Sequence, residues 1–596
     1  MKRPRLVLRG LVFFHRTHLG ALGTAALAAA VVVAALAVGD SVRSGLGDFA
    51  KARTGRVRFA AHAPDRLWRE ALASDVGGEL DVPVTSALLL AGTASRPDGT
   101  ARIANAQVLG VSEAFFALSP SGRSPPGFGS EDGVVVNEVA ASRLGIGTGD
   151  RLVLRVEKPA ATPRDSPLSS GAESTATFTA PVVGVADARE FGAFSLRVGG
   201  LPPANVYLPL SGLQAAVSEP GRANALFVGS GAEDAEAVSR ALGRCFRLAD
   251  AGLSLRWLGG GRGWQLESRR VILDPPAAAA ARKTEGAVGV LTWLVNDIEA
   301  HGRRTPYSIV AALPPRETFL PDDLASGEIV INTWLAEDLG AGPGDEVVLT
   351  YFVLGESRRL EEESATFEVR EVVPIEGPAA DRDLVPVLPG LTGTEDCRDW
   401  DPGFDLELGR IREKDEAYWD EHRGTPKAFL SLAAGRELWG NRFGSLTAVR
   451  FPAKRSKPAI EEGLEARLDP GAFGLMPVDL EETAARARRE GMDFGTLFLG
   501  FSGLLVAAAL LLMGLVTALN VEMRREEIGT LRALGFTDGR TRRLFAAEHA
   551  VVALLGGILG AGLGLVLAAA ALSALSTVWS DVAGSLALSV VVRPGT

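Results

Sequence analysis

The sequence predicts an α-helical membrane protein with three spans and a large α+β extracytoplasmic domain built from two related modules. Three long segments are almost free of charge, residues 19–39, 496–519 and 546–575. Each reaches the roughly 20 residues that a helix needs to cross the hydrocarbon core of a bilayer. Between the first two segments a strand–helix–strand pattern occurs twice, which predicts a duplicated α+β fold.

The N-terminal tail, residues 1–18, is basic and precedes the first span. It contains no acidic residue, and its five cations are Lys2, Arg3, Arg5, Arg9 and Arg16. Cationic segments beside a span stay on the cytoplasmic side, so we expect a cytoplasmic N-terminus. A signal peptide would also begin with a basic region, but this apolar core is longer and continues into GDSVRSGL without a convincing cleavage site. The first span is therefore interpreted as an uncleaved anchor.

The segment after the first span contains the repeat. Residues 133–156 read GVVVNEVAASRLGIGTGDRLVLRV, and residues 327–351 read GEIVINTWLAEDLGAGPGDEVVLTY. Both predict an apolar strand, a short helix, a Gly-Asp turn and a second strand. A further strand follows each copy, at FTAPVVGVAD and FEVREVVPIE. We expect module 1 over residues 40–270 and module 2 over residues 271–478.

Each predicted helix of the repeat has its own start and stop signals. Asn137 and Asn332 are suitable N-cap residues, because their side chains can accept hydrogen bonds from the first helical turn. Gly145 and Gly340 stand where a helix ends on a left-handed residue. Two unrelated segments would not share this order of elements and signals, so the sequence indicates an internal duplication.

The polar stretch at residues 479–495 predicts a stalk helix that leads into the second span. Residues 520–545, between the second and third spans, hold six arginines against four acidic residues. This hairpin should therefore be cytoplasmic, and residues 576–596 should lie outside. The chain is predicted to be a multi-pass protein of the cell (inner) membrane, in contact with lipid. The extracytoplasmic part is more negative than the formal net charge of −10, because the tail and the hairpin are both net positive, and this argues against nucleic acid as a partner.

The hairpin begins with the charged, helix-prone stretch RREEIGTLRALGF, residues 524–536. Ile528, Leu531 and Leu534 fall on one helical face, and Gly535 should end the helix. This apolar ridge could lie on the bilayer surface or enter a groove of a soluble partner. A plain interfacial turn is the alternative, although it would need no ridge.

Glu548 opens the third span, where a carboxylate is costly unless it is paired. Arg542 and Arg543 lie one or two turns upstream. Two interpretations remain open, a local salt bridge at the interface and a latch between the hairpin and the spans.

Catalytic, cofactor and metal motifs are absent from the sequence. GxxxxGK[ST], HExxH and GxSxG do not occur, and the glycine run GGGRGW at residues 259–264 has no lysine that would make it a phosphate loop. The two cysteines, Cys245 and Cys397, lack metal-ligand spacing, and whether they pair stays open.

The assembled pattern resembles the FtsX/MacB/LolC-type permeases of ABC transporters. The resemblance rests on the order of tail, span, large domain and further spans, and on RREEIGTLRALGFTDGRTRRLFAAE, similar to the family's R-x-E-I-G-x-L-R-A-L-G segment. GGILGAGLGLVL is similar to the family's glycine-rich span, and VVVNEVAASRLGIGTGDRLVL with FTAPVVGVAD to the MacB-type periplasmic core.

The resemblance implies that residues 524–536 form a coupling helix that docks on a separate cytoplasmic P-loop ATPase, which would bind the ATP. Hydrolysis there would move the extracytoplasmic domain, and the permease would act as a dimer or with a second permease. Its cargo stays open among lipoprotein, lipid, peptide and antibiotic. The implied docking residues are Arg524, Arg525, Glu527, Ile528, Gly529, Leu531, Arg532, Ala533, Leu534 and Gly535, with Glu548 as the possible latch.

The chain departs from the family in having three spans where at least four are usual, so we expect a truncated product or further spans on another polypeptide. Its extracytoplasmic domain is also larger than usual. One alternative function is a membrane-anchored ligand-binding or receptor protein without transport activity, which would need a cytoplasmic output domain. Another is an anchored hydrolase, which would need a nucleophile–base set that the sequence does not show.

Overall fold

The computed structural model describes residues 3–130, 133–159, 175–197, 202–354, 360–388, 391–392, 394, 397, 400, 406–490 and 494–583. These residues form two compact units. The helical unit comprises residues 1–55, 187–203 and 480–596, and the sheet unit comprises residues 56–186 and 204–479. The predicted C-terminal segment, residues 576–596, lies outside the described residues beyond position 583.

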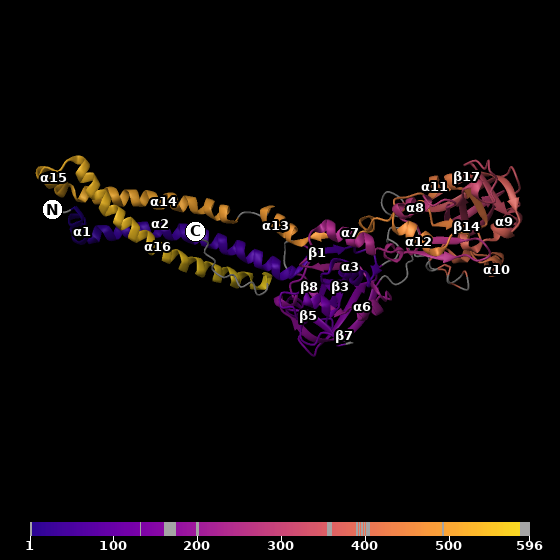
Figure 1. The fold of residues 1–596 in the computed structure, drawn as a ribbon, viewed down its shortest axis with the longest axis horizontal. Helices are drawn as coiled ribbons and strands as arrows, with labels where there is room; N and C mark the ends of the chain where they lie inside the picture. Colours follow the sequence, from indigo (N-terminus) through magenta and orange to yellow (C-terminus); the bar gives the residue numbers. More distant parts are fainter. Residues whose placement is uncertain are drawn as a thin grey trace. The chain divides into compact units, whose positions relative to one another are not determined.

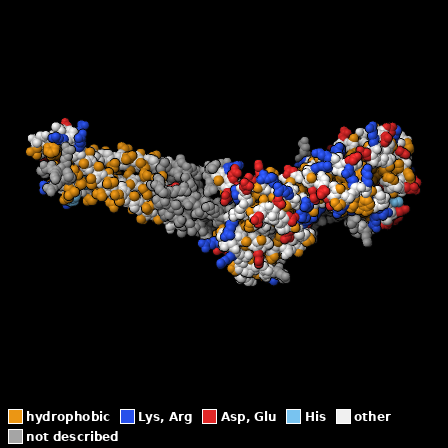
Figure 2. Space-filling view, in the orientation of Figure 1, with side chains coloured by type: hydrophobic (Ala, Val, Ile, Leu, Met, Phe, Trp, Pro, Cys, Tyr) orange, Lys and Arg blue, Asp and Glu red, His pale blue; other side chains and the backbone are white. Residues whose placement is uncertain are grey.

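The helical unit is built on three long helices that run side by side (Figure 1). Its helices are α1 (Arg3–Phe13), α2 (His15–Thr54), α13 (Leu480–Glu490), α14 (Phe494–Met523), α15 (Arg525–Ala533) and α16 (Asp538–Ala583). Three segments are long and apolar enough to cross a membrane, His15–Ser41, Gly503–Met523 and Asp538–Ala574. Hydrophobic side chains cover much of the visible face of this bundle (Figure 2). The prediction of three membrane helices is therefore confirmed.

Small residues let α16 approach α2 closely. A Cβ atom added at Gly560 would lie 2.3 Å from the backbone oxygen of Ala26, and one added at Gly556 would lie 2.7 Å from Cβ of Ala25. Gly564 meets α2 in the same way one turn further along. The stripe of glycines at every fourth position thus faces α2, as expected for helices that associate through van der Waals contact in lipid.

The sheet unit contains two nine-stranded sheets with the same order of strands. The first sheet has the order β20-β1-β10-β3-β4-β8-β5-β7-β6, and the second has the order β11-β12-β19-β13-β14-β18-β15-β17-β16. The strands of the first are β20 (Val478–Asp479), β1 (Val57–His62), β10 (Ala225–Gly229), β3 (Val84–Ser95), β4 (Arg102–Val111), β8 (Ala204–Pro209), β5 (Val134–Asn137), β7 (Thr175–Ala186) and β6 (Arg151–Glu157). Those of the second are β11 (Leu253–Trp257), β12 (Trp264–Ser268), β19 (Ala448–Phe451), β13 (Val288–Ala300), β14 (Arg303–Leu313), β18 (Ala428–Ser431), β15 (Glu328–Asn332), β17 (Leu360–Val373) and β16 (Glu346–Leu354).

The duplication extends through both modules. The long strands β3 and β13 also pair with β6 and β16, so that each sheet curls back on itself like a barrel. Helices occupy matching places, and the matching pairs are α3 (Leu72–Leu80) with α8 (Pro275–Arg282), α5 (Glu138–Leu144) with α9 (Thr333–Leu339), α6 (Leu210–Ala216) with α11 (Leu432–Trp439), and α7 (Ala235–Cys245) with α12 (Lys457–Glu465). The predicted pair of related α+β modules is confirmed.

The local signals of the repeat have the predicted geometry. The Oδ1 atom of Asn137 accepts a hydrogen bond from the backbone N–H of Ala140 at 2.9 Å, and Oδ1 of Asn332 accepts one from Leu335 at 2.8 Å. Gly145 and Gly340 end the two helices with φ of 62° and 67°. A residue with a Cβ would be strained at these φ values, which explains why both copies place glycine there.

The two modules exchange their last strands. Strand β11 follows module 1 in the chain but pairs with β12 of the second sheet over five residues. Strand β20 ends module 2 but pairs with β1 of the first sheet, with Ala60 opposite Val478 and Phe59 opposite Asp479. Residues 253–268 thus belong to the second sheet, although they precede the module boundary that the sequence predicts after residue 270.

A shared core holds the exchanged modules together. It contains Trp68 and Leu72 from module 1 together with Leu266 and Phe451 from module 2, all at most 1% exposed. Arg66 also donates two hydrogen bonds of 2.8 Å to the carboxylate of Asp274. Burial of this apolar surface at the seam favours one arrangement of the two modules. Cys245 and Cys397 do not form a disulfide bond, and Cys397 is buried.

Candidate functional site

The candidate site is the hairpin that joins α14 to α16 through the short helix α15. Helix α14 ends at Met523, and Arg524 precedes α15 with a non-helical backbone. Helix α15 ends at Ala533, and Gly535 has a φ of 87°. The N–H of Phe536 donates to the carbonyl of Leu531 across this glycine. The predicted helix stop is confirmed, because only glycine adopts this conformation without strain.

Arg524 and Glu548 form a buried ion pair at the base of the hairpin. Their side chains are only 2% and 1% exposed, and Nη1 of Arg524 donates to Oε2 of Glu548 at 2.5 Å. Nε of Arg524 donates to Glu527 at 2.6 Å. The guanidinium also lies 4.0 Å from the ring centroid of Phe14 and 4.3 Å from that of Phe545. These contacts compensate the desolvation of both charges and fix the hairpin to α16.

Helices α1 and α2 close the other side of this ion pair. His18 of α2 places Nε2 at 3.9 Å from Oε2 of Glu548. A Cβ atom at Gly10 of α1 would lie 2.1 Å from Oε1 of Glu548, so the glycine leaves room for the carboxylate. Asn520 of α14 donates to the carbonyl of Thr17 at 3.3 Å. The base of the hairpin thus contacts every membrane helix of the unit.

An apolar cavity of about 690 Å³ lies beside the ion pair. Its walls come from α1, α15 and α16, with Phe13, Phe14, Leu531 and Leu544 among the lining residues. Helix α1 and the hairpin therefore lie at the same end of the helical unit, as Figure 1 also shows.

The predicted docking residues divide between the two faces of α15. Leu534 is 73% exposed, and Arg525 and Arg532 are exposed with Glu522 and Asp538 as partners at 2.5 and 2.7 Å. Gly529 is exposed as well, and a Cβ atom added there would meet no atom within 4 Å.

The inner face holds the remaining predicted residues. Leu531 is 9% exposed, Ile528 and Glu527 are half-buried, and Arg524 is buried. The expected ridge of Ile528, Leu531 and Leu534 is thus not one exposed surface, because α15 packs its middle leucine against the cavity. The outward surface is smaller and more polar than the spacing predicts.

The partner of Glu548 also differs from the sequence expectation. Arg542 and Arg543 are exposed, whereas the carboxylate pairs with Arg524, which lies 24 residues earlier. Reasoning along one helix finds only neighbours at three or four residues. The buried pair exists because the hairpin folds the end of α14 back onto the start of α16.

Comparisons with known proteins match two parts of the chain. Residues 19–244 match the MacB-like periplasmic core domain, and residues 499–592 match the C-terminal domain of FtsX-like permeases. A search of curated proteins finds no match.

Two solved structures are similar to part of the chain. One is the extracellular domain of the noncanonic ABC-type transporter YknZ from Gram-positive bacteria, with 10% identity, a TM-score of 0.22, and coverage of 32% of this chain and 91% of that one. The other is the periplasmic region of MacB from Actinobacillus actinomycetemcomitans, with 13% identity, a TM-score of 0.21, and coverage of 33% and 84%.

The two family matches fall on the parts from which the sequence resemblance was drawn, and together they cover more than half of the chain. They agree with three membrane helices and with a strand–helix–strand core between the first two. The two family matches together indicate an ABC transporter permease of the MacB/FtsX type.

Proposed function

We propose that this permease couples ATP hydrolysis in a separate ATPase subunit to movement of its extracytoplasmic sheet unit. Helix α15 is the coupling helix, and its exposed face is the docking surface. The N-terminal tail and the hairpin lie in the cytoplasm of a cell whose inner membrane the three helices cross. The transported or released substrate is a lipoprotein, lipid, peptide or antibiotic.

The buried Arg524–Glu548 pair is the observation that carries this proposal. A docking helix transmits force only if its base is fixed to the elements that must move. Breaking a buried ion pair by removing one partner costs about 3–5 kcal/mol, since the other charge is left unpaired. A push on α15 is therefore passed to α14 and α16, and through His18 and Gly10 to the neighbouring helices.

The chain itself provides a route from these helices to the sheet unit. Helix α2 ends at Thr54 and strand β1 begins at Val57, while β20 ends at Asp479 and α13 begins at Leu480. Strands β1 and β20 are antiparallel neighbours, so both connections leave from the same end of one short ladder. If α2 and α13 moved apart, the paired residues of β1 and β20 would separate one pair after the other. If the two helices moved together, these pairs would stay formed.

The docking surface is tested by changing Leu534 to Asp and Arg532 to Glu in the full chain. We expect both variants to lose co-purification with a cytoplasmic P-loop ATPase, because a charge of the wrong sign or in an apolar contact opposes docking. Trp257→Asp, at a 46% exposed residue of the sheet unit, is the matched control and should keep the partner. If the Leu534→Asp variant still bound the ATPase, α15 would not be the docking helix.

The anchoring role is tested separately with Glu548→Gln. The amide keeps the size of the side chain but leaves the Arg524 charge buried, so we expect a clear loss of thermal stability of the full chain in detergent. Arg543→Gln removes an exposed charge of the same hairpin and should change stability by less than about 0.5 kcal/mol. Equal stability of both variants would contradict the anchor.

A further inference from the structure

Module 2 contains a cavity of about 510 Å³ on the face of its sheet, within the usual range of small-molecule sites. Apolar residues form most of its walls, and they are Val288, Val290, Leu313, Phe319 and Leu384. Its polar lining side chains are Arg262, Glu317, Thr318, Asp381 and Arg450. All of these residues belong to the sheet unit and none to the hairpin site.

The duplication shows what the same place looks like in module 1. Asn224 accepts a hydrogen bond from the backbone of Leu89, and Thr447 accepts one from Thr292 in the same way. These contacts fix the correspondence of strands β10 and β19, and three positions later Arg450 stands where module 1 has Phe227. A cationic side chain thus replaces a core aromatic.

Module 1 fills this place with aromatic rings. Phe115 lies 5.4 Å from Phe227 and 6.4 Å from Tyr207, and Phe116 lies 4.7 Å from Phe128, measured between ring centroids. In module 2, Phe319 packs against Phe429, the residue that corresponds to Tyr207, at 5.0 Å. The cavity therefore opens where module 1 is packed, beside the arginine that replaces Phe227.

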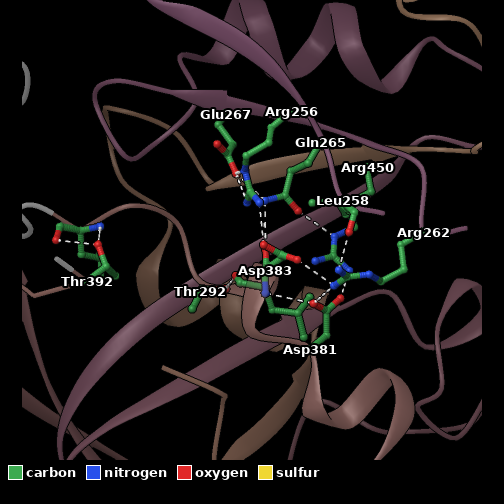
Figure 3. A network of polar contacts seen from close by, with 12 residues as sticks. Arg256, Leu258, Arg262, Gln265, Glu267, Thr292, Asp381, Asp383, Thr392 and Arg450 are labelled. Carbon is green, nitrogen blue, oxygen red and sulfur yellow. Dashed lines mark hydrogen bonds and ion pairs between the residues drawn. The ribbon is translucent and has the colours of Figure 1, made fainter. Parts of the chain in front are cut away.

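A network of ion pairs holds Arg450 at the cavity wall (Figure 3). Nη1 of Arg450 donates to Asp381 at 2.7 Å, and Nε donates to Oε1 of Gln265 at 2.8 Å. Asp381 also accepts from Arg262, which the glycine-rich turn GGGRG at residues 259–263 brings to the cavity. In the same network, Arg256 donates hydrogen bonds to Asp383 and Glu267.

One donor of this network has no acceptor. Nη2 of Arg450 is buried and makes no hydrogen bond to any residue that the structure describes. A buried donor left without an acceptor is costly, and a charged oxygen is the acceptor that a guanidinium binds most strongly. The network is neutral as a whole, since three arginines face Asp381, Asp383 and Glu267, so Nη2 is not an excess charge but a donor that still lacks an acceptor.

We propose that this cavity binds an amphiphile, with an oxyanion head group on Arg450 and an apolar chain against Val288, Val290 and Leu313. A carboxylate and a phosphate monoester share the required head-group chemistry. This site is independent of the coupling role of α15, and either can fail without the other.

The test uses the full chain in nanodiscs of neutral lipid and a twelve-carbon carboxylic acid with a photoreactive diazirine at the far end of its chain. After irradiation, mass spectrometry should find the label on peptides from β13 and β14. Dodecanoate should compete at a concentration at least about tenfold lower than dodecanol, because only the former offers Nη2 a charged acceptor. Dodecyl phosphate is the second arm, and the better competitor of the two anions identifies the head group.

Two variants test the contact with the apolar chain of the ligand and the contact with its head group. Val288→Phe narrows the cavity opposite Arg450 on the neighbouring strand and keeps every residue of the ion-pair network. Arg450→Phe restores the residue of module 1 while Asp381 keeps Arg262. Both should reduce labelling of β13 and β14 at least about fivefold, while Val387→Phe, at a residue 70% exposed and outside the cavity, should not. Labelling confined to the membrane helices, or unchanged in Val288→Phe, would overturn the site, and equal competition by dodecanol would overturn the head-group assignment.

Discussion

Replacement of Lys427 by methionine should change how the stability of module 2 depends on pH. Lys427 is 5% exposed and lies just before β18, with Nζ at 4.2 Å from the ring centroid of Trp334 and 4.8 Å from that of Tyr418. Its nearest carboxylate oxygen, on Asp415, is 3.7 Å away. Burial lowers the pKa of Lys427 from 10.5 to about 8, although the Asp415 carboxylate opposes this shift.

The direction in which stability changes with pH follows from the protonation state of Lys427 in the folded and in the unfolded protein. Below pH 8 the lysine is charged in both the folded and the unfolded protein, and the folded protein carries the cost of the buried charge. Between pH 8 and 10.5 the unfolded chain keeps the proton that the folded protein has lost, so the free energy of unfolding rises with pH. The shift corresponds to roughly 3 kcal/mol in full, of which about 2 kcal/mol should be gained between about pH 7 and about pH 9.5.

The other groups around the ammonium decide the design of the variant. Asp415 keeps two hydrogen bonds from Arg412, of 2.7 and 2.8 Å, so it is not left unpaired when the lysine is removed. Cys397 raises the pKa of Lys427 and is replaced by alanine in both proteins, so that the two proteins differ only at Lys427. Methionine has a similar length and no charge, and it keeps the apolar contact with Trp334 and Tyr418.

The measurement is urea unfolding of the sheet unit, produced as residues 56–479 and followed by tryptophan fluorescence. We expect the difference in unfolding free energy between Lys427→Met and its parent to favour the variant by about 2 kcal/mol more at about pH 7 than at about pH 9.5. Lys454→Met, at an exposed lysine of the same module, is the control. A difference that stays constant over this pH range would refute the buried-charge reasoning.

Two further predictions test the fold. Gly560→Leu should lower the thermal stability of the full chain in detergent by several degrees, because its Cβ would meet the backbone of α2. Gly557→Leu should leave the thermal stability unchanged, because a Cβ added at Gly557 would have no atom within 4 Å. The exchange of strands predicts that Ala60→Cys with Val478→Cys forms a disulfide on mild oxidation, since these residues are direct partners across β1 and β20. Ala60→Cys with Arg256→Cys should remain reduced, and a crosslink there would mean that β11 pairs within its own module.

Local sequence signals determined the elements of this protein. The three membrane helices follow from uninterrupted apolar segments, which need no partner to be identified. The duplicated core follows from asparagine caps and left-handed glycines, whose effect extends over only one helix. The hairpin helix and its stop at Gly535 follow for the same reason. These signals act over a few residues, so the sequence contains them in full.

Only the tertiary structure decided which elements meet. The partner of Glu548 depends on how the hairpin folds back onto α16. Arg524 is buried because α15 packs against the neighbouring helices beside the cavity. The exchange of β11 and β20 is made of backbone hydrogen bonds, which any side chain can accompany, so no residue pattern marks it. The cavity beside Arg450 likewise became visible only when the register aligned it with Phe227 of the other module. Long-range pairing and packing volume are properties of the folded chain, and no short segment of the sequence contains them.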